Sequence, residues 1–468
     1  MAAHRWDGAL TSLWTDLDGP DDATDVAWSG PDGLLPSPYP VGDLAMGAVG
    51  AAARAACELA AARGVDAGTP TVDGRRVAAS FRGDQLMRVD GAASPSFAPL
   101  SGFWATRDGW VRTHANYPHH RARLLDALGL PGADTGPDQL AATLRERTAE
   151  DVETTVTDAG GIATAVRSED AWDAHPQGRA VAAAPLIRRS TRDGGPGGPA
   201  PIADATAVRP ARGLRVLDLT RVLAGPVATR TLALLGADVL RIDPPGTAEI
   251  ESQHLDTGPG KRSATLDLRT PAGRSTLDDL LAGAHVLVTA YRPGSLGAFG
   301  LDPDELAVHR PDLVVATLDA WGDDGPFAAR RGFDSIVQAA SGIALRTVRD
   351  DGRPGALPAQ ALDHATGYLT AASVLLGLAD RFRLGTGTTA RLALARTAHR
   401  LRAMPAVDTA VDDDPTTALE PALTEIACAA GRLRLPRPAF RLARGPDTWE
   451  RPPTRWGSDV PAWGPRSG

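Results

Sequence analysis

Between residues 214 and 321, short apolar runs alternate with segments of helical composition, and this alternation is the strongest constraint on the fold. Two helical segments, 228–235 and 271–282, stand between runs that are rich in Val, Ile and Leu. Such runs are typical of strands buried on both faces, and their alternation with helices predicts parallel crossover connections. The runs are LRVLDLT (214–220), ADVLRID (237–243), SATLDL (263–268), HVLVTAY (285–291) and DLVVATLDAW (312–321). The sequence therefore predicts an α/β chain with a doubly wound, mostly parallel sheet.

The loop after the first predicted strand lacks the glycine pattern of dinucleotide-binding folds. It reads RVLAGP (221–226), whereas that fingerprint requires G-x-G-x-x-G. A second segment, GPGKRS (258–263), resembles a phosphate-binding loop only superficially, because Arg262 stands where Ser or Thr would hold magnesium. The two patterns disfavour a dinucleotide site and a nucleoside triphosphate site.

Charge and composition exclude several classes of function. The 468-residue chain has a formal net charge of −8, so it lacks the basic surface that attracts proteins to nucleic acid. Its start has no apolar signal segment, and the apolar stretch around residues 368–379 is too short to cross a bilayer. We therefore expect a cytoplasmic protein with no membrane partner. Neither cysteine belongs to a CxxC pair, and no Cys or paired carboxylate completes the histidines of THANYPHH (113–120), so we expect no metal site.

A segment rich in Gly, Pro and Asp divides the chain. Residues 190–212 (STRDGGPGGPAPIADATAVRPAR) have no periodic apolar spacing, which is typical of a linker. This linker separates residues 1–189 from the predicted sheet region, 213–400. Residues 401–468 carry only weak strand patterns and end in a Pro- and Trp-rich stretch, and we expect this tail to wrap the surface.

Two helical segments on either side of the linker resemble each other. GDLAMGAVGAAARAACELAAAR (42–63) aligns without a gap with LDHATGYLTAASVLLGLADRFR (362–383), and the alignment places Asp43 opposite Asp363. The strand-like segments that follow the two helices are RRVAASFR (75–82) and ARLALART (390–397). The pattern indicates two copies of one helix-strand unit, although two Ala-rich helices can also resemble each other through composition alone.

Five ordered segments of the C-terminal half form a longer pattern. They are GLRVLDLTRVLAGPVATRTLALLGADVLRIDPPG (213–246), KRSATLDLRTPAGR (261–274), YRPGSLGAFGL (291–301), GPFAARRGFDSIVQAASG (325–342) and LDHATG (362–367). Together they resemble the class III CoA-transferases, or CaiB/BaiF family, which includes formyl-CoA and carnitine CoA-transferases and α-methylacyl-CoA racemases. The resemblance implies a Rossmann-like large domain that binds coenzyme A (CoA), a smaller α+β lid domain, and interlocked dimers.

The N-terminal segment resembles the small domain of the same family, in an unusual order. GFWATRDGWVRTHANYPHHRARLLDALGLP (102–131) and AWDAHPQGRAVAAAPLIR (171–188) look like the small domain that ordinarily follows the catalytic half. We infer that residues 1–189 are a partial CoA-transferase copy, a helix-strand unit plus small domain, that supplies a lid to the second copy. The family implies a homodimer, and the tandem arrangement makes a monomer the alternative.

Asp363 is the predicted catalytic residue. In the family, the matching aspartate attacks an acyl-CoA thioester to form a mixed anhydride; CoA then returns to make an aspartyl-CoA thioester, which an acceptor carboxylate consumes. Covalent catalysis by a carboxylate divides one difficult transfer into easier steps, and the start of a helix offers N–H groups to the developing oxyanion. An ordinary helix N-cap is the structural alternative for Asp363, and it is the favoured role for Asp43. Asp334 is predicted to orient the substrate or the nucleophile, with a surface pair to Arg331 as the alternative.

The resemblance also assigns a binding site for CoA, which is expected as a substrate passed from an acyl-CoA donor to a carboxylic acid acceptor, with no tightly bound cofactor. Tyr291 is expected to stack on adenine. The cations Lys261, Arg262 and Arg269 are expected to meet phosphates. The full predicted set is Val222, Leu223, Ala224, Lys261, Arg262, Leu266, Arg269, Ala290, Tyr291 and Arg331.

Three positions of this predicted site are unusual. Pro244 follows the second strand where the family often has arginine, and Ala290 replaces an asparagine. Lys261 is the only lysine among the 49 basic residues. Either CoA binds with different phosphate partners, or the affinity has decayed.

Two other functions remain as alternatives. A racemase needs a second acid/base opposite the aspartate, but the Gly-His-Asp of the family's racemases is Gly332-Phe333-Asp334 here, and phenylalanine carries no proton. His364 is a weak replacement, because neighbouring helical side chains point about 100° apart. A non-catalytic CoA-binding subunit is the third reading, and the retained Asp363 counts against it.

Overall fold

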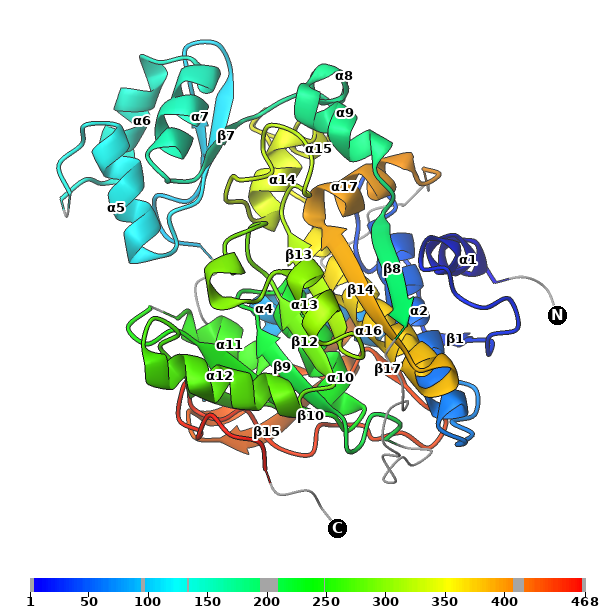
Figure 1. The fold of residues 1–468 in the computed structure, drawn as a ribbon. Helices are drawn as coiled ribbons and strands as arrows, with labels where there is room; N and C mark the ends of the chain where they lie inside the picture. The colour runs from blue at the N-terminus through cyan, green and yellow to red at the C-terminus, as the bar shows by residue number, and fades with distance from the viewer. Residues whose placement is uncertain are drawn as a thin grey trace.

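A seven-stranded sheet lies at the centre of the computed structural model, which describes residues 4–93, 97–132, 134–193, 209–247, 249–406 and 416–464 (Figure 1). Its strand order is β11-β10-β9-β12-β13-β14-β8; all neighbours are parallel except β8, which pairs antiparallel with β14 at the edge. The strands are β8 Ile187–Asp193, β9 Arg215–Leu219, β10 Asp238–Asp243, β11 Arg262–Thr265, β12 Val286–Thr289, β13 Val314–Asp319 and β14 Thr386–Ala393. The predicted α/β class with a large parallel sheet is confirmed.

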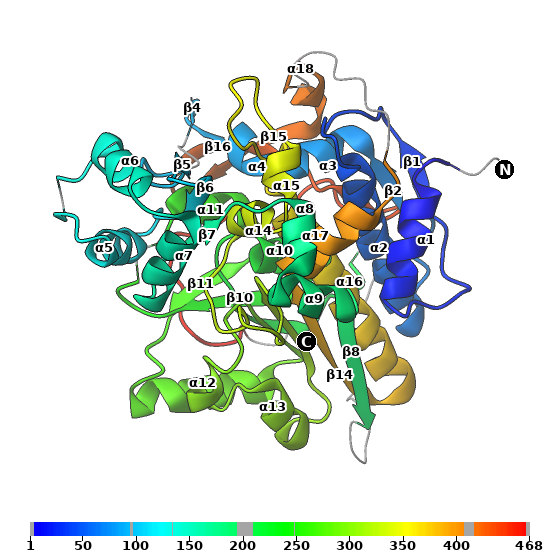
Figure 2. The ribbon, with the colours of Figure 1, turned by 90° about the horizontal axis from the view of Figure 1, so that it is seen from above.

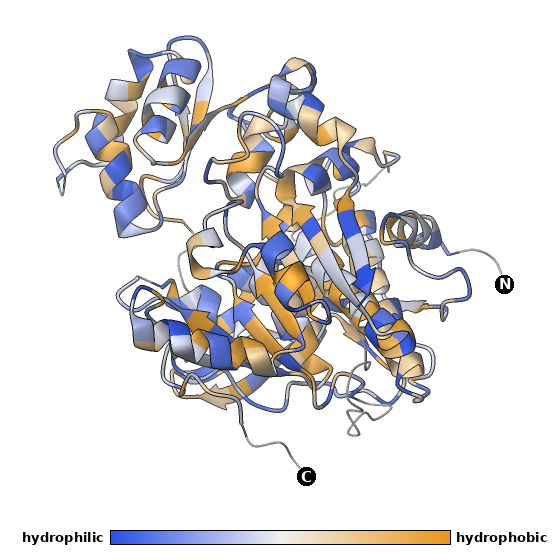
Figure 3. Ribbon diagram, in the orientation of Figure 1, coloured by the Kyte–Doolittle hydropathy of each residue, from blue (hydrophilic) through white to orange (hydrophobic). Residues whose placement is uncertain are grey.

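Both faces of this sheet are covered, because successive strand residues enter two different hydrophobic cores. Val216 of β9 belongs to one core and Leu217 to the other. Helices α10 (Ala224–Leu234) and α16 (Ala361–Leu384) supply the first core, whereas α12 (Pro271–Gly283) and α13 (Pro303–His309) supply the second. Figure 3 shows the most hydrophobic segments gathered in the sheet between these helices. Three shorter helices connect this part of the chain: α11 (Glu251–Thr257) follows β10, and α14 (Asp334–Ala340) and α15 (Ile343–Arg346) follow β13.

The two similar helical segments pack against each other. Helix α2 (Val41–Ala62) lies beside α16, as both ribbon views show (Figures 1 and 2). Each helix leads into a strand and then a second helix, and these following elements are β2 (Thr71–Asp73) and α3 (Gly74–Phe81) in the first unit and β14 and α17 (Leu394–Ala403) in the second. The predicted strand over 75–82 is therefore wrong. Asp73 caps α3 by accepting from the backbone N–H groups of Arg75 and Arg76, which starts a helix where the residue pattern suggested a strand.

Helix α2 is also long and apolar enough to cross a membrane by length and composition. However, 89% of its most apolar window is buried inside the protein, as in the core helix of a globular domain. It packs against α1 (Asp7–Asp16) as well as α16, and β1 (Ala27–Ser29) pairs in parallel with β2 nearby. The apolar stretch of α2 is thus a packing surface shared by the two halves of the chain.

Residues 97–166 form a small unit with its own hydrophobic core, seen at the upper left of Figure 1. Its antiparallel sheet has the order β5-β6-β7, from Phe103–Ala105, Trp110–Thr113 and Ala163–Ala165. Its helices are α5 (Pro118–Ala127), α6 (Pro137–Arg145) and α7 (Ala149–Asp158). Strands β6 and β7 contact α14 of the large unit, and the chain continues through α8 (Glu169–Ala174) and α9 (Pro176–Ala183) into β8.

Two predicted boundaries need correction. Strand β8 continues to Asp193, so the first residues of the predicted 190–212 linker belong to the sheet, while residues 194–208 lie outside the described residues. The 401–468 tail does more than wrap the surface. Its strands β15 (Leu423–Cys428) and β16 (Gly431–Pro436) join β3 (Arg88–Val89) and β4 (Ala92–Ala93) in a sheet, and β17 (Phe440–Arg441) pairs with β2. Leu433, Leu435 and Phe440 are buried, so burial of alternate residues fixes this segment.

Candidate active site

Two aspartates meet where α14 and α16 begin. The backbone N–H of Asp363 donates to Oδ2 of Asp334 at 3.0 Å, and both side chains are buried. Gln338, one turn later in α14, donates to the other oxygen of Asp334. Helix α16 starts at Ala361, so Asp363 is its third residue and does not cap it. The carboxylate of Asp363 therefore has no capping role, and Asp334 holds the backbone from which it projects.

Burial dominates the acid–base properties of this pair. It raises the pKa of Asp363 well above its usual range, and the charges of Asp334 and Asp84 add to the rise. Burial also raises the pKa of Asp334 to about 6 and that of Asp84, in α4 (Gly83–Leu86), to about 6. Because like charges in one buried site oppose each other's ionisation, the cluster retains protons at a pH where exposed aspartates would have lost them. Asp84 comes from the N-terminal half, and no sequence motif marked it.

The loop between β9 and α10 brings a backbone donor to Asp363. Val222 has a φ of 72°, a conformation that is rare for a β-branched residue and that stores strain. The backbone N–H of Ala224, at the first turn of α10, donates to the Asp363 carboxylate and thereby lowers its pKa. A Cβ at Gly367 would lie 2.5 Å from the Ala224 carbonyl oxygen, so only glycine lets the two helices approach this closely. The predicted segment Val222, Leu223 and Ala224 is therefore brought to the predicted nucleophile.

Lys261 and Arg262 are held elsewhere by the fold. Lys261 is 4% exposed, and its Nζ donates to Oδ2 of Asp218 at 3.1 Å and to the carbonyl of Pro226 at 2.9 Å. Arg262 pairs with Asp238 at 3.0 Å and donates to a backbone carbonyl of the C-terminal segment. Because Lys261 is already paired in the core, its expected role as a phosphate partner is corrected to a structural one. Arg262 is paired nearer the surface, and its expected role stays a prediction.

The other predicted residues follow the carboxyl ends of β11 and β12. Arg269 is largely exposed and pairs with Asp267 at 2.8 Å, and Leu266 is half-buried. Ala290 and Tyr291 come directly after β12. Tyr291 lines a solvent-open pocket, together with residues from the carboxyl ends of β13 and β14. The assignment of these residues to CoA stays a prediction.

Three arginines converge between the small unit and the large one. Nη1 of Arg123, in α5, and Nη1 of Arg331 both donate to the carbonyl oxygen of Gly160 at 3.2 Å. The charges of Arg292 and Arg123, together with burial, lower the pKa of Arg331. In the described residues, no carboxylate pairs with any of these three guanidinium groups. The predicted alternative pair of Arg331 with Asp334 is wrong, since the Asp334 carboxylate is fully buried and accepts from Gln338 and from the Asp363 N–H. Such a cluster of unneutralised cations favours an anionic ligand.

The small unit also packs against the residue that precedes Asp334. The His114 ring stacks on Phe333, the residue before Asp334, with ring centroids 3.9 Å apart, and His120 lies 5.9 Å from the same ring. His364 does not join them: it stacks on Phe81 at 5.1 Å, and burial lowers its pKa to about 3. The sequence reading marked the histidines of THANYPHH only as a possible metal cluster, and their contact with Phe333 depends on tertiary packing that no local pattern reveals.

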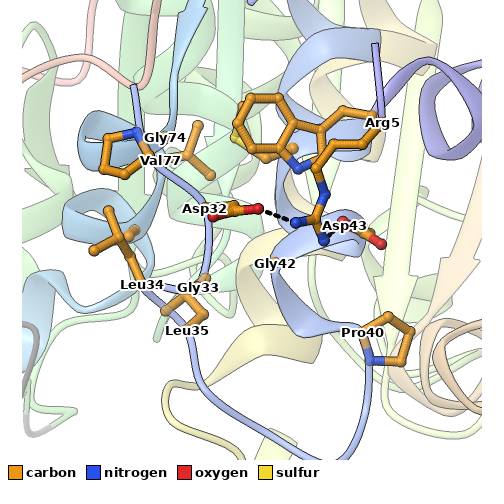
Figure 4. A pocket seen from close by; sticks show the side chains of 14 residues that line it. Arg5, Asp32, Gly33, Leu34, Leu35, Pro40, Gly42, Asp43, Gly74 and Val77 are labelled. Carbon is orange, nitrogen blue, oxygen red and sulfur yellow. Dashed lines mark hydrogen bonds and ion pairs between the residues drawn. The ribbon is translucent and has the colours of Figure 1, made fainter. Parts of the chain in front are cut away.

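A separate pocket surrounds Asp43, the counterpart of Asp363 in the first helical unit (Figure 4). Arg5 donates to the Asp43 carboxylate at 3.3 Å and also pairs with Asp32. Asp43 lies in the first turn of α2 but does not cap it, so the predicted cap is replaced by an ion pair. Its carboxylate pairs with Arg5, and among the residues that the structure describes no second buried carboxylate lines this pocket, so it lacks the arrangement found at Asp363.

Comparison with known proteins locates the similarity in the C-terminal half. Residues 212–428 match the sequence model of CoA-transferase family III. The chain is 33% identical over 254 residues to the "Probable fatty acyl-CoA transferase Rv3272" of Mycobacterium tuberculosis, covering 51% of this chain and 64% of that protein. It is also 33% identical over 199 residues to the mouse (Mus musculus) "Succinyl-CoA:glutarate CoA-transferase", covering 40% of this chain and 46% of the relative. The matches thus span about half to two thirds of the length of these relatives.

A CAIB/BAIF family protein from Brucella suis matches at 26% sequence identity and a TM-score of 0.38, covering 48% of this chain and 65% of the other.

Proposed function

Since residues 212–428 match the sequence model of CoA-transferase family III, we propose that this chain transfers CoA from an acyl-CoA thioester to a carboxylic acid, with Asp363 as the nucleophile. The observation that carries the proposal is the placement of Asp363. Its carboxylate is buried beside the N–H of Ala224, and its own backbone N–H donates to the carboxylate of Asp334. Relatives named as CoA-transferases support the reaction class.

The reaction proceeds through two exchanges at Asp363. The carboxylate attacks the thioester carbonyl, the carbon–sulfur bond breaks, and the acyl group leaves CoA to form a mixed anhydride with the aspartate. The CoA thiolate then attacks the aspartyl carbonyl and releases the acyl group as a free carboxylate, leaving an aspartyl-CoA thioester. The acceptor carboxylate repeats the sequence in reverse and departs as the new acyl-CoA. Each intermediate stores the activation of the original thioester, so covalent catalysis keeps the steps nearly balanced.

The fold supports a CoA site along the carboxyl ends of the parallel strands. Counted from β9, the strand order is 3-2-1-4-5-6, the order of Rossmann-like sheets, which bind ligands at that edge. The Tyr291 pocket opens there, and Arg292 belongs both to that pocket and to the arginine cluster with Arg123 and Arg331. We assign the CoA phosphates to these three arginines in place of Lys261, with the small unit as the lid.

Neutralising this arginine cluster should weaken CoA binding. We expect Arg331→Gln to raise the dissociation constant for CoA about 10-fold, and the Arg123→Gln/Arg331→Gln double variant to raise it further, because each charge-assisted hydrogen bond contributes roughly 1.5–3 kcal/mol. Titration calorimetry at low and high salt measures the effect, which should shrink as salt screens the phosphates. Arg107→Gln, an exposed arginine of the same small unit, serves as the matched control. Unchanged affinity in the double variant would place the phosphates elsewhere.

The pH dependence of covalent adduct formation should report on the aspartate pair. Only the ionised Asp363 carboxylate attacks, and burial raises its pKa, so the rate should still be increasing with pH in a range where an ordinary aspartate is already fully ionised. Asp334→Asn removes one negative charge that raises the pKa of Asp363, so the rise should move to lower pH. Stopped-flow or quenched-flow mass spectrometry across pH 5–9 measures both profiles. A profile that stays in place in Asp334→Asn would show that the two carboxyl groups are not coupled.

Intact-mass spectrometry tests the proposed function directly. The full chain is incubated with a panel of acyl-CoA esters, and peptide mapping is expected to locate a CoA adduct on Asp363. No adduct and no exchange across the panel would exclude the transferase. Exchange of the α-proton without CoA transfer would instead support a racemase, and CoA binding without either reaction would support a binding subunit.

A further inference from the structure

Glu153, in α7 of the small unit, is a buried carboxylate that binds two arginines. It is 3% exposed, and its Oε1 accepts from the hydroxyl of Thr164 at 2.9 Å. Arg167 donates to both oxygens of this carboxylate, and Nη1 of Arg330 lies 3.3 Å from Oε1. Both guanidinium groups also lie over the ring of Phe327, at 3.9 Å from its centroid for Arg330 and 5.8 Å for Arg167. Because these hydrogen bonds are charge-assisted and directional, the carboxylate fixes the two arginines relative to each other.

The two arginines lead to opposite ends of α14, the helix that starts at Asp334. Arg330 lies in the segment that enters this helix, four residues before Asp334. Arg167 lies two residues after β7, and its backbone N–H donates to the carbonyl oxygen of Ala339, in the last turn of α14, at 3.1 Å. Glu153 therefore ties both ends of α14 to the small unit.

Two further contacts join the small unit to the segment that enters α14. The Arg331 guanidinium donates to the carbonyl oxygen of Gly160, in the turn after α7, at 3.2 Å. His114 stacks on Phe333, with ring centroids 3.9 Å apart. Three of the four residues that precede α14 thus contact the small unit through their side chains, so this segment follows the small unit when that unit moves.

We propose that Glu153 is a positioning residue for the transfer reaction, through which the contact of the small unit with α14 sets the position of Asp334 and hence that of Asp363. The inference rests on the proposed function and goes beyond it by naming the residue through which the lid acts on the nucleophile. Asp334 accepts the backbone N–H of Asp363 at 3.0 Å, so a shift at the start of α14 moves a hydrogen bond that holds the nucleophile. Glu153 acts only through its two arginines and takes no part in the chemistry.

Single-turnover kinetics of the Asp363 adduct test the proposal. In Glu153→Gln, the amide does not neutralise the two guanidinium groups, which then repel each other, so α14 should lose both ties. We expect adduct formation at saturating acyl-CoA to slow about 10- to 100-fold, because a misplacement of about 1 Å at a reacting group has effects of this size. The pH profile should move to lower pH, since a displaced Asp334 raises the pKa of Asp363 less; Asp84 stays in place, so the shift should be partial. Glu150→Gln, an exposed carboxylate of the same helix, is the matched control and should change neither rate nor profile.

A double variant shows whether Glu153 acts through Asp334. In the Asp334→Asn background the charge that raises the pKa of Asp363 is already gone. Glu153→Gln should therefore add no further shift of the pH profile and less than about 3-fold further loss of rate, the non-additivity expected of residues in one network. Losses that multiply in full, or an unchanged pH profile in the single variant Glu153→Gln, would show that Glu153 only supports the fold, and the proposal fails.

Hydrogen exchange keeps this inference distinguishable from the proposed function. In the chain without substrate, Glu153→Gln should speed exchange of the α14 amides, while α12, in the other hydrophobic core, keeps its protection. Unchanged exchange in α14 overturns the inference whether or not the chain is a transferase. No adduct in the wild type with any donor overturns the proposed function, and the exchange result then decides the tie between Glu153 and α14. Should Glu153→Gln not fold, Arg330→Gln, which breaks only the tie at the start of α14, replaces it in each measurement with the same expected directions.

Discussion

Replacing Asp363 with asparagine should abolish the covalent CoA adduct and reduce CoA transfer by at least about three orders of magnitude, as expected when a nucleophile is removed. Asparagine has nearly the same shape and can still accept the hydrogen bond from the Ala224 N–H, so α16 should keep its position beside α10. Its amide cannot form the anhydride. Intact-mass spectrometry measures the adduct, and an assay of CoA exchange between two acids measures transfer.

The chain contains its own control for this experiment. Asp43 occupies the matching place in the first helical unit, but it pairs with Arg5 and has no buried carboxylate partner. Asp43→Asn should therefore leave the adduct and the transfer rate within about 2-fold of the wild type. Retained adduct in Asp363→Asn, or equal losses in the two variants, would contradict the assignment of the nucleophile.

Much of the central fold could be predicted from residue patterns, because the signals are local. Each parallel strand is buried on both faces and therefore reads as an apolar run, as at Val286–Thr289. The tail was harder to predict. Its strands are stabilised by pairing with β3 and β2, which lie more than 300 residues earlier, so their short alternating runs carry little signal on their own. The segment 75–82 was misread for a related reason: a cap at Asp73 outweighed its strand-like composition.

The residues of the candidate site also fall into two groups, those that a continuous sequence pattern reveals and those that only tertiary packing brings in. Asp363, Asp334 and the β9–α10 loop lie in segments whose family pattern is continuous along the chain, and the structure brings them together. Asp84 reaches the Asp363 site, and Arg123 reaches the arginine cluster, from the N-terminal half, in segments separated from Asp363 by more than 200 residues. No spacing rule connects such residues. Residue charge alone also led to a wrong expectation. Lys261 lies just before β11, close in sequence to the expected phosphate site, but its ammonium group points into the core.

Lys261 should prove to be a stability determinant. Lys261→Met keeps the length of the side chain but leaves Asp218 as a buried carboxylate without its cation. Removing one partner of a buried pair typically costs about 3–5 kcal/mol. The hydroxyls of Thr220 and Thr229 and the backbone N–H of Thr220 still donate to Asp218, so we expect a loss near the lower end, about 3 kcal/mol. Chemical denaturation followed by circular dichroism measures the change.

The double variant Asp218→Asn/Lys261→Met distinguishes this account from a role in CoA binding. With both charges removed, no unpaired ion remains in the core, so stability should recover by more than half of the loss in Lys261→Met. The affinity for CoA, measured well below the unfolding transition, should remain within about 2-fold of the wild type in both variants, because the Nζ of Lys261 lies beneath α10 and donates to Asp218 and Pro226. If the double variant regains stability but binds CoA 10-fold more weakly, the buried lysine also shapes the phosphate site through α10. If stability is unchanged in Lys261→Met, the ion pair contributes nothing to the core, and the survival of a single lysine in an arginine-rich chain has no structural cause.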